Sequence, residues 1–415
     1  MKLDMSGTLC VLSAALDYVE SEVFSDVTHH SRRVAYLCLT LGRSLDYPDS
    51  CLSDLTGVAV MHDNALTEYI AAKRMLSRGK QVTAIELTPH CELGEKNMER
   101  LPFYSRVKGV ILYHHENADG SGPFHRKTAE TPVFSRMIHL ADQLDTLFHL
   151  AEMTPKKYEQ LVRWVKEERG ALIDGELAEE FLKSVSFEML KKMEGERVTA
   201  LLSSSLPIFE QDYGNEEIIA LATVFARIID YKSHFTSTHS LGIAQKAAAM
   251  GKFRDCSEEE CTKLYLAGAL HDIGKLTIPN EILEKPGKLT KAEFEIMKGH
   301  AYASYQILKK LKDLPDVTSW AYLHHEKLDG SGYPFGKTAA ELNENERLLA
   351  CLDIYQALTE ARPYKAGLSH SRAIRMMRDL ASTGKIDAGI TEEIDKCFSV
   401  GGAANRMTLS VTKSR

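Results

Sequence analysis

One set of histidines and acids occurs twice in this chain, and this repeat constrains the fold more than any other feature of the sequence. The first copy runs from His30 to Asp142 and the second from His239 to Asp353. Each member of the second copy follows its counterpart by 209 to 211 positions. Seven positions that stay so nearly in register indicate a duplicated domain.

The two copies contain the same residue types in the same order. The first copy consists of His30, His62, Asp63, His90, His114, His115 and Asp142. The second copy consists of His239, His271, Asp272, His300, His324, His325 and Asp353. The agreement extends beyond these residues, because a His-His-Glu triplet followed by Asp-Gly-Ser-Gly occurs at 114–122 and again at 324–332.

The repeat predicts two domains of similar size. We expect the first at 1–202, a linker at 203–218, the second domain at 219–405 and a polar tail at 406–415. The segment Ser203–Pro207 marks the junction with a run of serines and a proline. Because the linker is short and contains no glycine-rich tether, we expect the two halves to pack together.

Helical periodicity dominates both halves. Apolar residues recur at intervals of three and four, as in Ala222, Phe225, Ala226 and Ile229, and alternating strand patterns are scarce. A chain of 415 residues with 44% hydrophobic residues can form two cores. We therefore expect an all-α protein with two tandem helical domains.

Composition and charge narrow the range of partners. The formal charge of -7 disfavours DNA and an anionic membrane as partners. The eight cysteines include no CxxC pair, which is typical of reduced cysteines in the cytoplasm. The apolar run from Leu9 is broken by Asp17, so it resembles neither a signal peptide nor a membrane span. We expect a cytoplasmic protein, and the sequence leaves open whether it forms a homodimer.

The second set of residues has the chemistry of a metal centre. Imidazole and carboxylate ligands suit iron, manganese or zinc, and seven of them exceed what one ion needs. Two ions that share Asp272 are the economical interpretation, and such a pair can activate water against a phosphoester. Lys275 follows Asp272 by three residues, so on a helix the two side chains would share a face.

Three long motifs carry a family resemblance. They are HDIGKLTIPNEILEKPGKLT at 271–290, HHEKLDGSGYP at 324–334 and ARPYK at 361–365. On these motifs, residues 220–400 resemble an HD-GYP domain, the metal-dependent branch of the HD phosphohydrolase superfamily. The resemblance implies an all-helical fold and hydrolysis of a 3',3'-cyclic dinucleotide to a linear dinucleotide. Cyclic di-GMP is the usual substrate of that family, and 3'3'-cGAMP is also used.

The resemblance also implies a role for each matching residue. The catalytic residues would be Asp272 and Lys275. The ligands of the first ion would be His239, His271, Asp272 and Asp353. The ligands of the second ion would be Asp272, His300, His324 and His325. The substrate contacts would be Tyr333, Pro334, Arg362 and Lys365.

The resemblance favours two divalent ions in the second half. Iron or manganese is expected first, and zinc, nickel, magnesium and calcium remain open. Some members hold a third metal with a glutamate, but Phe235 stands at that position here. Gln356 stands where the family often has aspartate, which we expect to alter the hydrogen bonding behind Asp353 without removing a ligand.

The first half keeps the ligand types but lacks the groups expected to handle substrate. Leu66 replaces Lys275, and Phe124 stands in a Gly-Pro-Phe segment where the second half has Gly-Tyr-Pro. No Arg-Pro-Tyr segment follows Asp142. We interpret this half as a degenerate HD domain without cyclic-dinucleotide hydrolase activity, and hydrolysis of another phosphoester stays open. Its histidines either bind a further metal or form hydrogen bonds in a core.

Two other functions stay open for the chain. One is an HD-type nucleotidase that acts on mononucleotides. The other is a receptor that binds a cyclic dinucleotide without hydrolysing it. The complete ligand set and Lys275 favour a hydrolase over a receptor.

Overall fold

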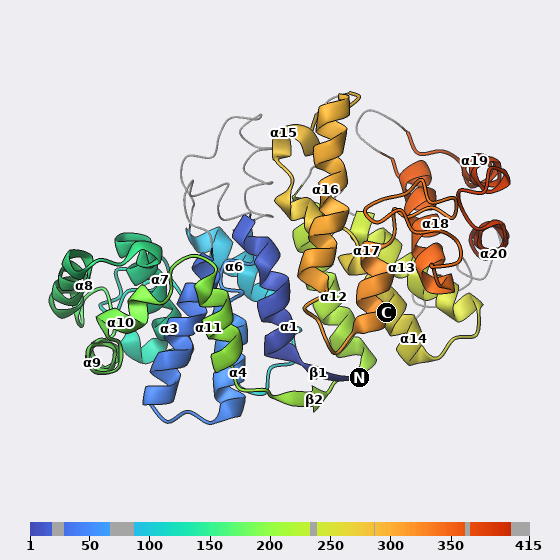
Figure 1. Cartoon of the computed structure of the whole chain (residues 1–415). Helices are drawn as coiled ribbons and strands as arrows, with labels where there is room; N and C mark the ends of the chain where they lie inside the picture. Colours follow the sequence, from blue (N-terminus) through green and yellow to red (C-terminus); the bar gives the residue numbers. More distant parts are fainter. Residues whose placement is uncertain (19–28, 67–86, 233–238, 286, 362–365, 400–415) are drawn as a thin grey trace. The chain divides into compact units, whose positions relative to one another are not determined.

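The computed structural model describes residues 1–18, 29–66, 87–232, 239–285, 287–361 and 366–399. The regular secondary structure of these residues is almost all helix, which confirms the all-α prediction (Figure 1). The two named strands in these ranges, β1 (Lys2–Asp4) and β2 (Glu210–Asp212), pair antiparallel with Lys2 opposite Asp212. Every helix in the described ranges is too short or too polar to span a bilayer.

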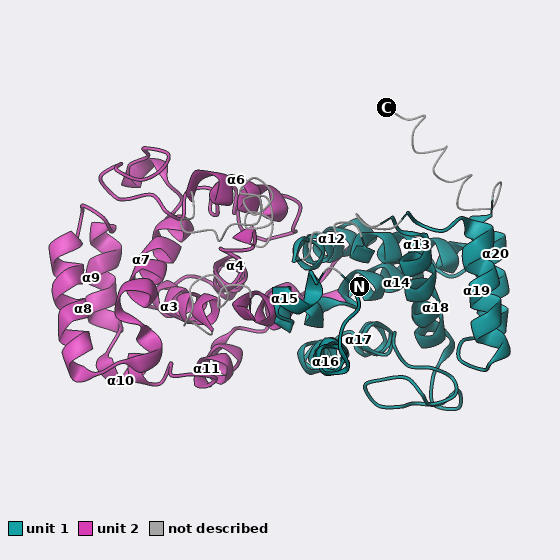
Figure 2. Cartoon of the chain, turned by 90° about the horizontal axis from the view of Figure 1, so that it is seen from above, with its two compact units in different colours: residues 1, 214–415 teal, residues 2–213 magenta. Residues whose placement is uncertain are grey.

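The chain forms two compact units (Figure 2). One comprises residues 2–213, and the other comprises residues 214–415 together with Met1. Helices enter the expected linker from both sides, because α11 (Arg197–Ser205) ends inside it and α12 (Asn215–Tyr231) begins inside it. The packing of one half against the other stays a prediction, and the expected tail at 406–415 lies outside the described residues.

The first unit is built around α3. Its helices within the described residues are α1 (Met5–Leu12), α3 (His30–Ser44), α4 (Asp49–Ala59), α6 (Leu87–Met98), α7 (Val133–Phe148), α8 (Pro155–Glu168), α9 (Gly175–Ser184), α10 (Phe187–Lys191) and α11. Short 3-10 turns lie at η1 (Ser13–Ala15), η2 (Thr128–Glu130) and η3 (Leu150–Glu152). Helix α3 packs against α4, α7, α9 and α11.

The second unit repeats this arrangement. Its helices are α12, α13 (His239–Phe253), α14 (Glu258–Leu270), α15 (Asn280–Leu283), α16 (Lys291–Leu308), α17 (Pro315–Tyr322), α18 (Glu344–Thr359), α19 (His370–Ser382) and α20 (Ala388–Phe398), with the 3-10 helix η4 (Ile273–Thr277). Helix α13 packs on α14 and α18, as α3 packs on α4 and α7. The repeated residues therefore occur on equivalent elements of the two units.

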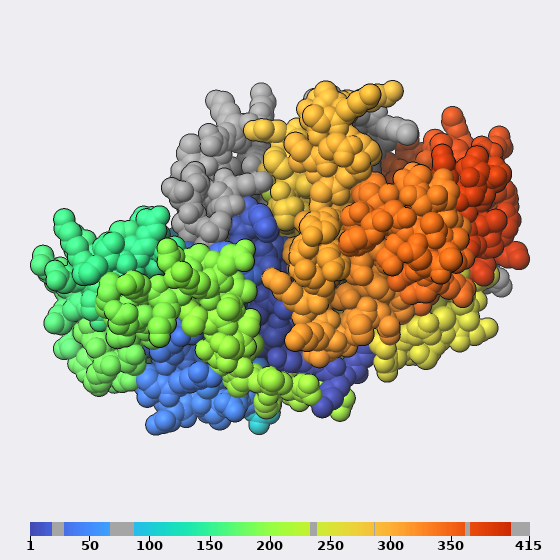
Figure 3. Space-filling view, viewed as in Figure 1, coloured from blue at the N-terminus to red at the C-terminus, as the bar shows by residue number. Residues whose placement is uncertain are grey.

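Helix α16 shows how local sequence sets an element that carries a site residue. Thr290 accepts a hydrogen bond from the Glu293 N–H (3.3 Å), and the Glu293 carboxylate accepts one from the Thr290 N–H (2.7 Å). This capping box starts the helix that contains His300. Phe294, Ile296 and Tyr302 of α16 are about half exposed, and the outer turns of the helix, in gold, lie at the surface in Figure 3.

Helix η4 packs tightly on α16 through Gly274. A Cβ at Gly274 would overlap the backbone of His300 and Ser304. Ser304 accepts a hydrogen bond from the Gly274 N–H (2.9 Å) and donates one to the His271 carbonyl (3.0 Å). A side chain at position 274 would therefore push η4 away from α16.

Gly274→Ala is expected to lower the free energy of unfolding by about 1–3 kcal/mol, because overpacking at this contact cannot be relieved by rotating a side chain. Gly299→Ala is the matched control, because a Cβ there would meet no atom within 4 Å beyond its chain neighbours and the nearby backbone of its own helix. Alanine inside a helix is more favourable than glycine by roughly 0.5–1 kcal/mol. Thermal unfolding of both variants measures the change in the free energy of unfolding. A Gly274→Ala protein as stable as the wild type would contradict the tight contact between η4 and α16.

Candidate active site

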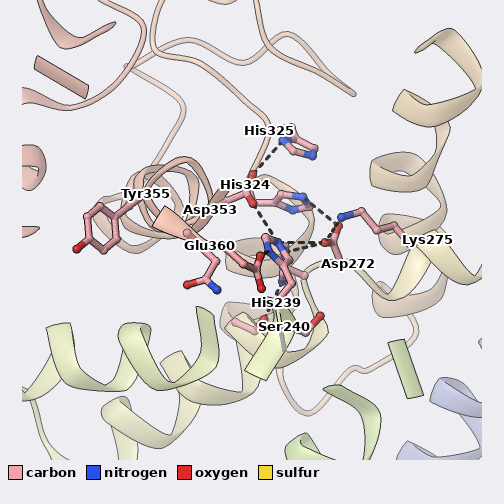
Figure 4. A network of polar contacts seen from close by, with 12 residues as sticks. His239, Ser240, Asp272, Lys275, His324, His325, Asp353, Tyr355 and Glu360 are labelled. Carbon is pink, nitrogen blue, oxygen red and sulfur yellow. Dashed lines mark hydrogen bonds and ion pairs between the residues drawn. The ribbon is translucent and has the colours of Figure 1, made fainter. Parts of the chain in front are cut away.

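Five segments bring the second set of residues to one place, and Figure 4 shows five of these residues, namely His239, Asp272, His324, His325 and Asp353. His239 begins α13, and His271 and Asp272 follow the last turn of α14. The remaining residues are His300 in α16, His324 and His325 just after α17, and Asp353 in α18. The structure therefore places all seven sequence-predicted residues of this half together.

The Asp272 carboxylate lies between two groups of imidazoles. Its side chain is 2% exposed. Oδ2 lies 3.0 Å from His271 Nε2 and 3.6 Å from His239 Nε2. Oδ1 lies 3.4 Å from His300 Nε2 and 3.7 Å from His324 Nε2. Each oxygen thus faces a different pair of histidines, which is the arrangement expected of a carboxylate shared by two ions.

Asp353 closes the other side of the cluster. Its Oδ1 lies 3.4 Å from His239 Nε2, and its Oδ2 lies 3.5 Å from His325 Nδ1. His325 Nε2 is also 3.1 Å from His300 Nε2. Groups whose ligand atoms lie within 4.8 Å of one another include His239, His271 and Asp353, and separately His300, His324 and His325.

The hydrogen bonds of the ring nitrogens fit a metal centre. The Nδ1 atoms of His271, His300 and His324 donate to the backbone carbonyls of Gly268 (2.7 Å), Met297 (2.6 Å) and Ala321 (2.6 Å). The Nε2 lone pairs therefore point into the cluster. Within the described residues, the Nε2 atoms of His239, His271 and His324 and Oδ1 of Asp272 are buried and make no hydrogen bond. Buried acceptors of this kind are unfavourable unless an ion or a proton satisfies them.

The charges of these side chains also suit metal ligands. Burial raises the pKa of Asp272, but His271 and Lys275 outweigh this effect and hold the pKa well below its usual range. Burial lowers the pKa of His300 to about 3 and that of His324 well below its usual value. At neutral pH these imidazoles are uncharged and the carboxylate is ionised, which are the forms that ligate metals.

His239 differs from the other histidines in its protonation. Burial acts to lower its pKa, but the carboxylates of Asp353 and Glu360 outweigh burial and raise the pKa to about 9. An ion held by His239 Nε2 would therefore have to displace a proton from this ring. The helix start that positions His239 depends on Asp230 of α12, whose carboxylate accepts hydrogen bonds from the N–H groups of Ser240 (2.8 Å) and Leu241 (3.3 Å).

Lys275 contacts Asp272, as the spacing of three residues predicted. Its ammonium donates to Oδ2 of Asp272, and its side chain is 21% exposed. The connecting backbone is the 3-10 helix η4 rather than an α-helix, and residues three apart in a 3-10 helix eclipse one another. The ammonium therefore lies beside the Asp272 carboxylate, and its side chain remains partly exposed to solvent.

Tyr333 lies against the histidines. Its ring centroid is 4.7 Å from that of His325 and 6.4 Å from that of His300. Pro334 follows in the same loop, and the Glu326 carboxylate holds this loop by accepting from the N–H groups of Phe335 (2.7 Å) and Lys337 (2.9 Å). The other sequence-predicted substrate contacts, Arg362 and Lys365, lie outside the described residues, as does Phe235.

Sequence reasoning assigned no role to Glu326, Asp230 or Glu360. The repeat offered a signal for Glu326, because Glu116 occupies the same position in the first half and accepts from the N–H groups of Phe124 (2.6 Å) and Arg126 (2.5 Å). For Asp230 and Glu360, the sequence contained no comparable signal. Both act on residues that only helix packing brings near.

The first half assembles the same cluster. Asp63 Oδ1 lies 2.8 Å from His90 Nε2 and 3.9 Å from His114 Nε2, and Oδ2 lies 3.6 Å from His62 Nε2. Asp142 Oδ1 lies 3.2 Å from His30 Nε2, and Asp142 Oδ2 lies 3.6 Å from His115 Nδ1. In the described part of the chain, the Nε2 atoms of His62 and His114 are buried and make no hydrogen bond. Leu66, which replaces Lys275, is 2% exposed.

Comparison with known proteins finds a family and several relatives that resemble this chain. The HD domain family matches residues 19–177 and 223–390. The 3'3'-cGAMP-specific phosphodiesterase 1 of Vibrio cholerae is 30% identical over 89% of this chain and 87% of its own length. A cyclic di-GMP phosphodiesterase of Pseudomonas aeruginosa is 36% identical over 35% of each chain.

A solved structure has the same fold. The crystal structure of a cyclic GMP-AMP-specific phosphodiesterase of Vibrio cholerae superposes with a TM-score of 0.64 at 23% identity. The match covers 97% of this chain and 98% of the other. The tandem helical architecture is therefore shared along the whole length.

Proposed function

Because the chain belongs to the HD domain family, we propose that its second half is a metal-dependent phosphodiesterase that hydrolyses a 3',3'-cyclic dinucleotide. One observation carries the proposal: the buried Asp272 carboxylate faces His239 and His271 with one oxygen and His300 and His324 with the other. This arrangement suits a pair of divalent ions, with iron or manganese preferred by the nitrogen and oxygen ligands.

The choice between substrates is supported by the relatives. A relative named for 3'3'-cGAMP matches 89% of this chain, and a second one matches 74%. The relative from Pseudomonas aeruginosa named for cyclic di-GMP matches 35% of it. We therefore propose 3'3'-cGAMP as the first substrate to test and cyclic di-GMP as the second.

The chain's own side chains have distinct roles in this proposal. When bound, the two divalent ions would supply an activated water and neutralise the charge that develops on the phosphate oxygens. Asp272 and Asp353 stay ionised and fix the imidazoles around them. Lys275 lies beside Asp272, where its ammonium can pair with a phosphate oxygen or protonate the leaving 3'-oxygen. Tyr333 forms an aromatic wall next to His325, suited to a purine or ribose.

Hydrolysis adds one water across one P–O bond and gives a linear dinucleotide with a terminal phosphate and a free hydroxyl. The test is to incubate the full chain, loaded with Mn(II) or Fe(II), with 3'3'-cGAMP, cyclic di-GMP or GMP and to identify products by mass spectrometry. We expect linear dinucleotides from a cyclic substrate. Binding without any linear product would support a receptor instead, and release of phosphate from GMP alone would support a nucleotidase.

We also propose that the first half binds a divalent ion without hydrolysing cyclic dinucleotides. The first part is supported by the Nε2 atoms of His62 and His114, which are buried and make no hydrogen bond within the described residues. The second part is supported by Leu66, which puts an apolar side chain where the other half has an ammonium. A phosphate at this position would have no cationic partner from residue 66.

Metal analysis of paired variants is expected to separate the two sites. His62→Ala should reduce the metal bound per chain while leaving hydrolysis little changed. His271→Ala should also reduce the metal content and should abolish hydrolysis. A His62→Ala protein with the metal content of the wild type would contradict a metal site in the first half.

A further inference from the structure

The first histidine of each copy is held by a carboxylate, but the two carboxylates come from different positions. In the first half, Asp145 Oδ2 is 2.6 Å from His30 Nδ1. Asp145 also accepts hydrogen bonds from Arg33 Nε (2.6 Å) and Nη2 (2.9 Å). In the second half, His239 Nδ1 donates instead to Oε2 of Glu360 (2.9 Å).

The second half lacks both the aspartate that contacts His30 and the arginine that pairs with this aspartate. Aligned through the repeat, Arg33 corresponds to Gly242 and Asp145 corresponds to Gln356. A Cβ at Gly242 would lie 2.6 Å from Gln356 Nε2, so the glutamine amide occupies the space that a side chain would need. Gln356 Oε1 accepts a hydrogen bond from Lys246 Nζ (2.7 Å), which directs its oxygen to that lysine.

Helix geometry explains how a more distant residue reaches the same ring. Gln356 follows Asp353 by three residues and Glu360 follows Gln356 by four, so all three lie on one face of the helical path. Glu360 is the C-cap residue of α18, as His149 is of α7. The carboxylate that contacts the histidine in the second half therefore lies one helical turn closer to the end of its helix than Asp145 does in the first half.

We infer that Glu360 is the positioning residue for His239, taking the place that Asp145 has in the first half. This inference rests on the proposed function, in which His239 is a metal ligand. By accepting the Nδ1–H, Glu360 selects the tautomer that leaves Nε2 facing Asp353, 3.4 Å away. The His239 and Glu360 side chains are only 3% and 10% exposed, so water has little access to replace this contact.

The role belongs to the Glu360 side chain and not to its backbone. The C-cap hydrogen bond of α18 runs from the Glu360 N–H to the Gln356 carbonyl (2.8 Å) and survives any substitution except proline. Glu360→Ala thus removes the carboxylate while keeping the end of the helix. The effect on metal binding can then be measured apart from the fold.

The experiment measures Mn(II) affinity of the full chain by titration against a competing chelator. We expect Glu360→Ala to weaken binding at one site by about 10- to 100-fold, the usual effect of removing a group that orients a ligand. Glu360→Gln, which keeps a hydrogen-bond acceptor, should retain most of the affinity. Adding Gln356→Asp to Glu360→Ala should restore binding, because an aspartate at that position reaches the equivalent ring in the first half.

Glu259→Ala is the control, since Glu259 is 56% exposed and pairs with Lys263 (3.1 Å) at the surface. Wild-type Mn(II) affinity in Glu360→Ala, or a double variant that recovers nothing, would overturn the inference. A different result would contradict the proposed function. If the wild-type chain bound Mn(II) but cleaved no cyclic dinucleotide, the proposed hydrolase activity would be wrong, while the role of Glu360 in positioning His239 would be unaffected.

Discussion

Asp272→Asn is expected to lower kcat/KM for the cyclic dinucleotide by about 10³-fold or more, equivalent to about 4 kcal/mol of transition-state stabilisation. The same substitution in the first half, Asp63→Asn, should leave hydrolysis little changed. The two aspartates occupy equivalent places in the repeat and are both buried. The pair therefore separates loss of the reaction from a general effect of removing a buried charge.

The size of the effect follows from the contacts of Asp272. Its two oxygens face four imidazoles, and Oδ2 also accepts a hydrogen bond from the Lys275 ammonium. An asparagine has one acceptor oxygen and one amide group, so one side of the cluster would face N–H donors instead of a negative charge. We expect the metal content of Asp272→Asn to fall as well.

Steady-state kinetics with Mn(II)-loaded protein and metal analysis of both variants test this prediction. Circular dichroism provides the check that both variants remain helical. Equal losses of activity in Asp63→Asn and Asp272→Asn would mean that the reaction does not belong to the second half alone. Wild-type activity in Asp272→Asn would remove the shared carboxylate from the proposal.

Lys275→Leu is expected to lower kcat by about 10²- to 10³-fold while the metal content stays close to that of the wild type. The substitution converts the second half to the side chain that the first half has at Leu66. The ammonium is not among the nitrogen and oxygen ligands of the cluster, so its loss should affect phosphate charge and leaving-group protonation more than metal binding.

Lys263→Leu is the matched control for this variant, because Lys263 lies on the surface of α14 and pairs with Glu259 (3.1 Å). Its kcat should equal that of the wild type. If Lys275→Leu also turned over at the wild-type rate, the ammonium would have no part in the reaction. If it lost its metal instead, Lys275 would act by stabilising the Asp272 carboxylate.

Much of the architecture was open to prediction from the sequence. Helical periodicity predicted the all-α class, and the structure confirms it. The HDIGK motif predicted that Lys275 lies beside Asp272, which it does, although on a 3-10 helix. Periodicity could not predict the tighter helix, nor the close contact that its Gly274 makes with α16.

The repeat by itself determined which residues could form the cluster, since the spacing of seven histidines and acids is a property of the chain alone. Only the tertiary structure decided how each one is held. His239 and Glu360 are 121 residues apart, and their hydrogen bond exists because α13 packs against α18. A periodic pattern reports which face of a helix is apolar, but a hydrogen bond between two helices depends on their relative position to within a fraction of an ångström.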